Sequence, residues 1–117
     1  MQQDLKKCTV LTEKQARSLE NNFPNFEDLE LMSRLFDVFS DVGRMKILCA
    51  LSICDMCVSD LCSILKENQT TISHRLAVLK NFGVVRSERE GKIIVYKIKN
   101  KRIFNLFLEA VETIQEN

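Results

Sequence analysis

The stretch NQTTISHRLAVLKNFGVV, residues 68–85, predicts a short helix with one apolar side and one polar side. The side chain of Asn68 is suited to cap this helix, because its oxygen can accept a hydrogen bond from a free backbone N–H. Three apolar residues recur at helical spacing and are expected to face a core: Ile72, Leu76 and Leu79.

The polar side of this helix carries residue types that bind DNA bases. Hydrogen-bonding side chains crowd its first two turns: Gln69, Thr70, Thr71, Ser73 and Arg75. Such side chains pair with base edges, and a recognition helix presents its N-terminal residues to the major groove. The sequence therefore predicts a helix that reads DNA.

A basic β-hairpin is predicted directly after this helix, from the sequence RSEREGKIIVYKI. Gly83 is expected to end the helix as a left-handed cap. Strands are then expected at residues 84–89 and 92–98, around a turn at Glu90 and Gly91. This order of elements suits a protein that places a helix in a groove and braces it with a wing.

Four further helices are expected from capping residues and apolar spacing: at about residues 12–21, from residue 25, from residue 41 and at residues 58–66. Thr12 and Gln15 form a capping box at the start of the first. Asp41 can cap the third. In the fourth, three residues are expected to point inward: Leu61, Ile64 and Leu65.

The C-terminal residues 102–116 predict a closing helix with a broad apolar stripe. Its members are Ile103, Phe104, Leu106, Phe107, Ala110, Val111 and Ile114. This stripe is wider than one small domain covers. Together with the phenylalanine-rich residues 29–39, it suggests a dimer interface made of both ends of the chain; the alternative is that these two helices pair within one chain.

Length and composition indicate one globular domain, since the 117 residues are 45% hydrophobic and 28% charged. No apolar run approaches the ~18 residues of a membrane helix, and the N-terminus lacks a signal-peptide core. We therefore expect a cytoplasmic protein with no membrane partner. Five cysteines, an odd number, indicate thiols rather than a disulfide framework.

The positive charge is concentrated in one region of the chain. Residues 69–102 carry nine basic and two acidic side chains, whereas residues 1–65 carry seven basic and ten acidic ones. A basic region of this kind attracts phosphate, although a solvated lysine and arginine face is the alternative. The polar helix beside it favours DNA.

Three segments of the chain resemble the ArsR/SmtB family of winged-helix repressors. They are SDVGRMKIL at residues 40–48, CVSDL at residues 57–61, and TISHRLAVLKNFGVV with REGKIIVYKI at residues 71–98. The resemblance covers about residues 27–116. It implies a mainly α-helical fold with a small β-hairpin, a dimeric winged helix-turn-helix. Residues 1–24 would form an N-terminal arm with a short helix, and residues 25–117 the winged-helix DNA-binding and dimerisation domain.

The resemblance also implies a transcriptional repressor that acts as a homodimer on double-stranded DNA. Its operator would be an imperfect inverted repeat, released when As(III), Cd(II), Pb(II), Zn(II) or another thiol-binding signal binds. The implied DNA-binding residues are Gln69, Thr70, Thr71, Ser73, His74, Arg75, Arg89 and Lys92. Arg89 and Lys92 on the wing would anchor phosphates. His74, the single histidine, is interpreted as a structural or phosphate-contacting residue.

The family's thiolate sensors begin the first helix of the helix-turn-helix with Cys-Val-Cys, whereas this chain has Cys57-Val58-Ser59. Serine is a poor ligand for soft metals. Cys54 could compensate, and Cys8 could reach the site from the same or the other subunit, as N-terminal cysteines do in some relatives. The implied metal ligands are thus Cys54, Cys57 and Cys8, with a metal or metalloid as inducer and no obligatory cofactor.

Other cysteines and a second family site are interpreted differently. Cys49 and Cys62 fall on apolar helical faces and are expected in the core. Cys49 also matches a reactive cysteine of the family's sulfide- and redox-sensing branch, but the last helix has no partner cysteine. A zinc site between the C-terminal helices is not expected, because arginine cannot ligate the metal. The residues at its positions are Asn100, Arg102, Thr113 and Glu116.

Three alternatives stay open: a regulator that responds to thiol oxidation or persulfide, a regulator without a ligand, and a winged-helix module that binds another protein. An enzyme is not expected. The chain has one histidine, no glycine-rich phosphate loop and no recognisable pair of catalytic carboxylates.

Overall fold

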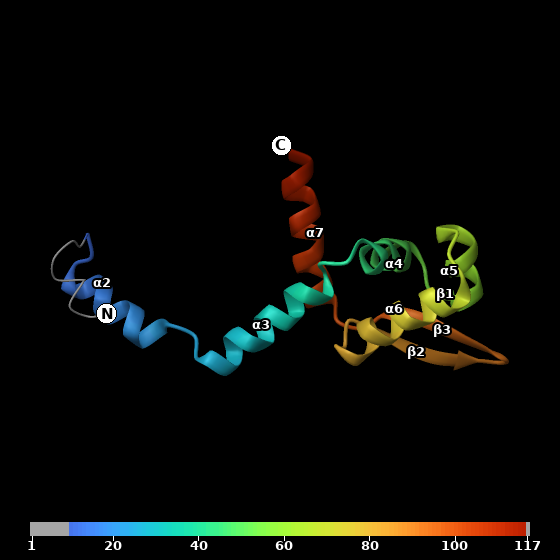
Figure 1. Ribbon diagram of the computed structural model, residues 1–117, viewed down its shortest axis with the longest axis horizontal. Helices are drawn as coiled ribbons and strands as arrows, with labels where there is room; N and C mark the ends of the chain where they lie inside the picture. The colour runs from blue at the N-terminus through green and yellow to red at the C-terminus, as the bar shows by residue number, and fades with distance from the viewer. Residues whose placement is uncertain (1–9, 117) are drawn as a thin grey trace. The chain divides into compact units, whose positions relative to one another are not determined.

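The computed structural model describes residues 10–116, which form mainly helices and one small sheet (Figure 1). The helices are α2 (Glu13–Asn22), α3 (Phe26–Val38), α4 (Val42–Ile53), α5 (Val58–Leu65), α6 (Gln69–Asn81) and α7 (Lys101–Glu116). The strands are β1 (Met56–Cys57), β2 (Val85–Glu90) and β3 (Ile93–Ile98). The chain divides into two units, Met1–Met32 and Ser33–Asn117, and the second contains the core and the sheet.

Helices α2 and α3 both begin at a capping residue, near the helix starts that the sequence predicts. The Thr12 hydroxyl accepts a hydrogen bond from the Gln15 N–H at 3.1 Å, and the Gln15 side chain accepts one from the Thr12 N–H at 3.0 Å. This reciprocal pair is the predicted capping box. The Asn25 side chain accepts from the Asp28 N–H at 2.8 Å and so caps α3.

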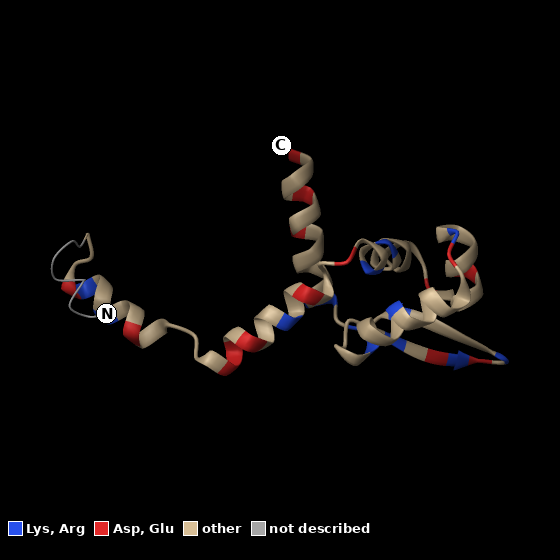
Figure 2. Cartoon of the chain, viewed as in Figure 1, with Lys and Arg blue, Asp and Glu red and all other residues tan. Residues whose placement is uncertain are grey.

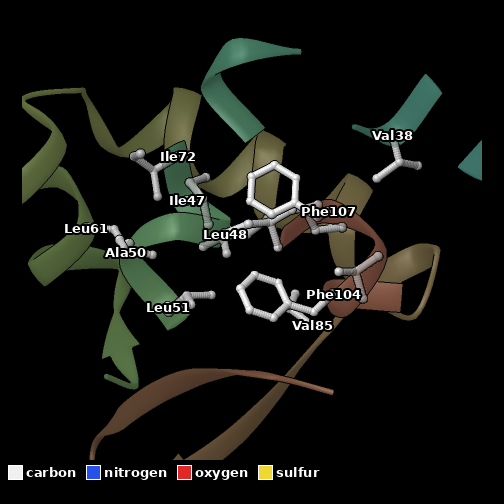
Figure 3. Packing of buried hydrophobic residues seen from close by; sticks show 13 residues of the cluster. Val38, Ile47, Leu48, Ala50, Leu51, Leu61, Ile72, Val85, Phe104 and Phe107 are labelled. Atoms are coloured by element: carbon white, nitrogen blue, oxygen red, sulfur yellow. The ribbon is translucent and has the colours of Figure 1, made fainter. Parts of the chain in front are cut away.

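The core lies where α4, α5, α6, the hairpin and α7 meet. Figure 3 shows Phe104 and Phe107 of α7 turned toward Leu48 and Leu51 of α4. The predicted inward residues of α6 are all buried: Ile72, Leu76 and Leu79. Burial of this stripe fixes α6 on the core with its opposite side facing out.

Both ends of α6 are closed as the sequence predicts. The Asn68 side chain accepts a hydrogen bond from the Thr71 N–H at 2.8 Å. At the other end, the N–H of Gly83 donates to the Lys80 carbonyl and that of Val84 to the Leu79 carbonyl, both at 3.0 Å. This pair of bonds is a Schellman motif, in which Gly83 adopts a φ of 85°.

The sheet has the strand order β1-β3-β2, and all pairs are antiparallel. Strand β1 extends the hairpin by pairing Met56 with Tyr96. The predicted turn at Glu90 and Gly91 is wrong by one residue. Glu90 still pairs with Ile93 in the ladder, so the turn consists of Gly91, with a φ of 66°, and Lys92.

Two predictions of buried residues are wrong. Cys49 is exposed in α4, and Ile64 is 63% exposed in α5. Helix α4 has a second apolar side besides the one in the core, and this second side forms a surface groove together with Ile64 and Leu65. Its apolar residues in the groove are Val42, Met45, Cys49, Ala50 and Ile53, and Lys46 also lines the groove. Helical spacing could not tell the two sides apart. Cys62, by contrast, is partly buried against the core as expected.

Helix α7 is apolar on two sides, and only one packs on the core. Phe107 contacts Phe39 with ring centroids 5.6 Å apart. On its other side Leu106 is 53% exposed and Ile114 is 72% exposed. The broad apolar stripe of the sequence is therefore only partly covered within one chain. Among residues 10–116, no helix is long and apolar enough to cross a membrane.

The left-handed cap of α6 leads to a stability prediction. Gly83→Ala should lower the free energy of unfolding by about 1 kcal/mol, because an L-residue is strained at positive φ. A new methyl group would meet no atom within 4 Å, so the loss would come from the backbone alone. Urea unfolding at one fixed protein concentration measures it. Asn81→Ala, in ordinary helical backbone nearby, should cause no loss; equal stability of Gly83→Ala and the wild type would contradict the assignment.

Candidate nucleic-acid interface

The outward side of α6 presents a continuous polar face. Gln69, Thr70, Ser73 and His74 are exposed, and Thr71 at the edge of this face is half-buried. These positions lie on one side of a helix with 3.6 residues per turn. Five of the six predicted DNA-binding residues of the helix are therefore brought together on or beside one accessible surface.

Arg75 does not lie on this face. Its side chain is 24% exposed, and its Nη1 donates a hydrogen bond to Glu67 Oε1 at 3.2 Å. Its Nε lies 3.9 Å from Asp41 Oδ2. The guanidinium thus has two carboxylate partners within the protein, on the flank of α6 that faces α4.

The hairpin has one side toward α6 and one side away from it. Lys80 of α6 donates a hydrogen bond to the Ser87 hydroxyl at 2.7 Å, which identifies the side facing α6. Alternate residues of a strand share a face, so Arg89 lies on the same side as Ser87. Lys92 is exposed in the turn. Figure 2 shows basic residues along α6 and at the far end of the hairpin.

The acidic residues of the hairpin lie on the opposite side. Lys97 Nζ is 3.5 Å from a carboxylate oxygen of Glu88, 3.5 Å from one of Glu90 and 3.6 Å from Asp55. Arg86 also pairs with Glu88, and its hydrogen bond, followed by the charge of Lys97, lowers the pKa of Glu88. Burial disfavours the charge of Lys97, but attraction to Glu88 and Glu90 outweighs it and raises the pKa of Lys97. The acidic charge of the hairpin is thereby partly offset by cations on the side away from α6.

Two basic residues with defined contacts, Lys80 and Arg44, were not singled out by the sequence. Lys80 adds a positive charge at the end of α6 nearest the hairpin. Arg44 donates hydrogen bonds to the carbonyls of Val38 at 2.8 Å and Asp37 at 2.9 Å, at the end of α3. The sequence does show Lys80 three residues before the predicted cap at Gly83, and this position was a signal for its place beside the hairpin. The contacts of Arg44 depend on how the chain turns between α3 and α4.

Comparison with known proteins identifies the family. Residues 41–87, from the cap of α4 into β2, match the family described as "Bacterial regulatory protein, arsR family". The chain is 36% identical over 117 residues to the cadmium resistance transcriptional regulatory protein CadC of Listeria innocua, covering 99% of this chain and 98% of CadC. It is 35% identical over 66 residues to the arsenical resistance operon repressor of Escherichia coli, 56% of each chain.

The chain belongs to the arsR family.

The solved structures agree with this family in fold. The homodimeric winged helix-turn-helix DNA-binding domain Mb0332 of Mycobacterium bovis superposes with a TM-score of 0.72 at 24% identity, covering 81% of this chain and 91% of that one. The expected fold class, mainly α with a small β-hairpin, is confirmed. Helices α5 and α6 form the helix-turn-helix of this arsR-family protein, and β2 and β3 form its wing. The chain is thus a DNA-binding transcriptional regulator.

The predicted metal ligands of this arsR-family protein are only partly within the described residues. Cys8 lies outside residues 10–116. Cys54 is exposed at the end of α4, in a groove that Asp60 also lines. Cys57 is half-buried at the start of α5. Within residues 10–116, no three side chains of the ligating types come together to hold a metal ion, so these two thiols do not complete a site by themselves.

Cys57 has a specific partner in Asp60. Its backbone N–H and its thiol both lie 3.3 Å from Asp60 Oδ2, and both donate to it. The carboxylate thereby satisfies a free N–H at the start of α5. The proton of the Cys57 thiol is part of this arrangement.

One of the C-terminal positions of the second family site has another role. The Asn100 side chain accepts a hydrogen bond from the Ile103 N–H at 3.0 Å and so caps α7. Arg102 is exposed. The prediction of no zinc at this place stays a prediction.

Basic residues on the two sides of the hairpin should contribute differently to DNA binding. Arg89→Ala and Lys92→Ala should each weaken binding to every sequence. Each should also flatten the dependence of log affinity on log salt by up to about 1, because each removes a phosphate contact. Lys97→Ala removes the same charge from the side facing away and should leave the slope unchanged. Fluorescence anisotropy over a salt series measures this; equal slopes for all three variants and the wild type would remove Arg89 and Lys92 from the interface.

Proposed function

We propose that this arsR-family protein is a homodimeric repressor that binds an imperfect inverted-repeat operator and is released by a thiol-binding signal. The polar face of α6 beside the basic side of the hairpin carries the proposal. Gln69, Thr70 and Ser73 have the side chains that pair with base edges, and all are exposed. Thr71 and His74 flank them, and Arg89 and Lys92 would hold phosphates.

The uncovered apolar surface supports a homodimer. Leu106 and Ile114 of α7 are exposed, and α3 also exposes large apolar side chains, which are Phe26, Leu29, Leu31, Met32 and Phe36. Exposed apolar surface on two helices of one small protein favours association. A second copy of the chain is a suitable partner, because a two-fold dimer reads half-sites about one helical turn, ~34 Å, apart. We assign residues 1–24 to an N-terminal arm and residues 25–117 to the DNA-binding and dimerisation domain.

The thiols at the start of α5 support a soft metal or metalloid as the signal. Cys54 and Cys57 supply two sulfur donors, and Cys8 is the proposed third. Thiolate ligands suit Cd(II), As(III), Pb(II) and Zn(II). A metal binds the thiolate form, so ligation removes the proton that Cys57 donates to Asp60. The start of α5 would then lose a hydrogen bond, and α5 is the helix that precedes the recognition helix.

A thiol-redox response is the second candidate for the signal. Exposed Cys54 and half-buried Cys57 are accessible to oxidants or persulfide, and oxidation would remove the same thiol proton. The two candidates differ in the reagent that releases the DNA. We propose no catalytic step for this regulator.

One titration tests the proposal. The reduced protein should bind a duplex from upstream of its own coding sequence more tightly than a scrambled duplex. Cd(II) or As(III) should then weaken that binding about 5- to 150-fold, the usual range of allosteric coupling. Cys54→Ser and Cys57→Ser should each abolish the response.

Cys49→Ser is the matched control, since Cys49 is an exposed thiol on α4 outside the proposed ligand set. It should respond as the wild type does. Release by peroxide or persulfide but not by metal would favour the redox candidate. A full metal response in both the Cys54→Ser and Cys57→Ser variants would refute the thiolate site, and equal binding to both duplexes would refute the operator.

A further inference from the structure

The side chain of Arg75 is held between α6 and α4 by several contacts. Three groups surround its guanidinium: the Glu67 carboxylate at 3.2 Å, the Asp41 carboxylate at 3.9 Å and the backbone of Gly43. Glu67 belongs to the turn between α5 and α6, and Asp41 is the cap of α4. One side chain of the recognition helix thus contacts two other elements at the same time.

Gly43 is what allows the guanidinium to come this close. A Cβ built on Gly43 would lie 2.2 Å from Cζ and 2.3 Å from Nε of Arg75, far inside any real contact. Gly43 does not have a positive φ, so its backbone conformation does not require glycine. Glycine is a poor helix former, and here it sits in the first turn of α4. The close approach of Arg75 accounts for it.

The contacts of Arg75 continue beyond α4. Asp41 Oδ2 accepts a hydrogen bond from the Arg44 N–H at 2.9 Å, and Arg44 in turn donates to the carbonyls at the end of α3. A cation beside the first turn of α4 would be unfavourable next to the positive end of the helix dipole. The carboxylates of Asp41 and Glu67 offset this. The network therefore runs from the recognition helix through the cap of α4 to the end of α3.

We propose that Arg75 is a positioning residue that locks α6 onto α4 and sets the angle at which the polar face meets DNA. The inference rests on the DNA-binding function of the chain, and it reassigns Arg75 from the set that contacts DNA. The guanidinium already donates to the Glu67 carboxylate and lies beside the Asp41 carboxylate and the backbone of Gly43, and these contacts hold it away from the polar face. The contribution of Arg75 to affinity then comes through the placement of its neighbours.

Gly43→Ala separates the two roles of Arg75, because it displaces the guanidinium without changing Arg75 or any residue of the polar face. We expect Gly43→Ala and Arg75→Gln each to weaken binding to the upstream duplex roughly 5- to 50-fold, the size of coupling between residues in one network. The salt slope should stay unchanged in both. The double variant should bind no more weakly than Arg75→Gln alone.

Three further measurements complete the experiment. Arg86→Gln removes an equal charge and breaks an ion pair on the far side of the hairpin, and it should leave affinity unchanged. Glu67→Gln keeps the size of the side chain but removes one partner of Arg75, so it should weaken binding as Arg75→Gln does. The thermal midpoint of Gly43→Ala is measured alongside, and weaker binding at a temperature well below that midpoint shows that the loss of affinity does not come from unfolding.

The inference is overturned if Gly43→Ala binds as tightly as the wild type or more tightly, since a freed arginine that contacts DNA would do that. It is also overturned if Arg75→Gln flattens the salt slope by about 1, which marks a phosphate contact. Both results require wild-type binding to the upstream duplex. Failure of the wild type to bind would instead refute the operator and the inference together.

Discussion

Burial of one side of α6 determines what its other side can offer to DNA. Ile72, Leu76 and Leu79 are buried in the core, so the helix cannot rotate without exposing them. Fully burying such a side chain is worth about 1.5–3 kcal/mol. The polar residues on the opposite side, Gln69 and Ser73 among them, are therefore held outward. The Asn68 cap and the Gly83 motif fix where this helix begins and ends.

Charge is arranged around this helix so that attraction is directed to one side of the hairpin. Net charge is only +1, too small to indicate nucleic acid. The basic charge is nevertheless directed to one side of the hairpin. Alternation along β2 puts Arg89 on the side that faces α6 and Glu88 on the other side. Lys97 and Arg86 partly offset the acidic charge on that other side. The local field near the recognition helix is thus more positive than the composition suggests.

Local patterns predicted the elements well and their partners less well. Caps at Thr12 and Asn68 depend on residues three apart, so the sequence contains them. The exposure of Cys49 was missed because α4 is apolar on two sides and its spacing fits either. The surroundings of Arg75 were missed for a different reason: Asp41 and Glu67 come from other elements, and only the fold brings them to it. In the sequence, the one indication of a close contact at this place was a glycine in the first turn of α4.

A structure of the protein bound to a duplex from upstream of its own coding sequence would show directly how α6 meets DNA. We expect Gln69, Thr70 and Ser73 in the major groove, with Arg89 and Lys92 beside phosphates and two copies of the chain related by a two-fold axis. A complex in which α6 points away from the duplex, or in which the DNA lies on another surface of the protein, would contradict this expectation.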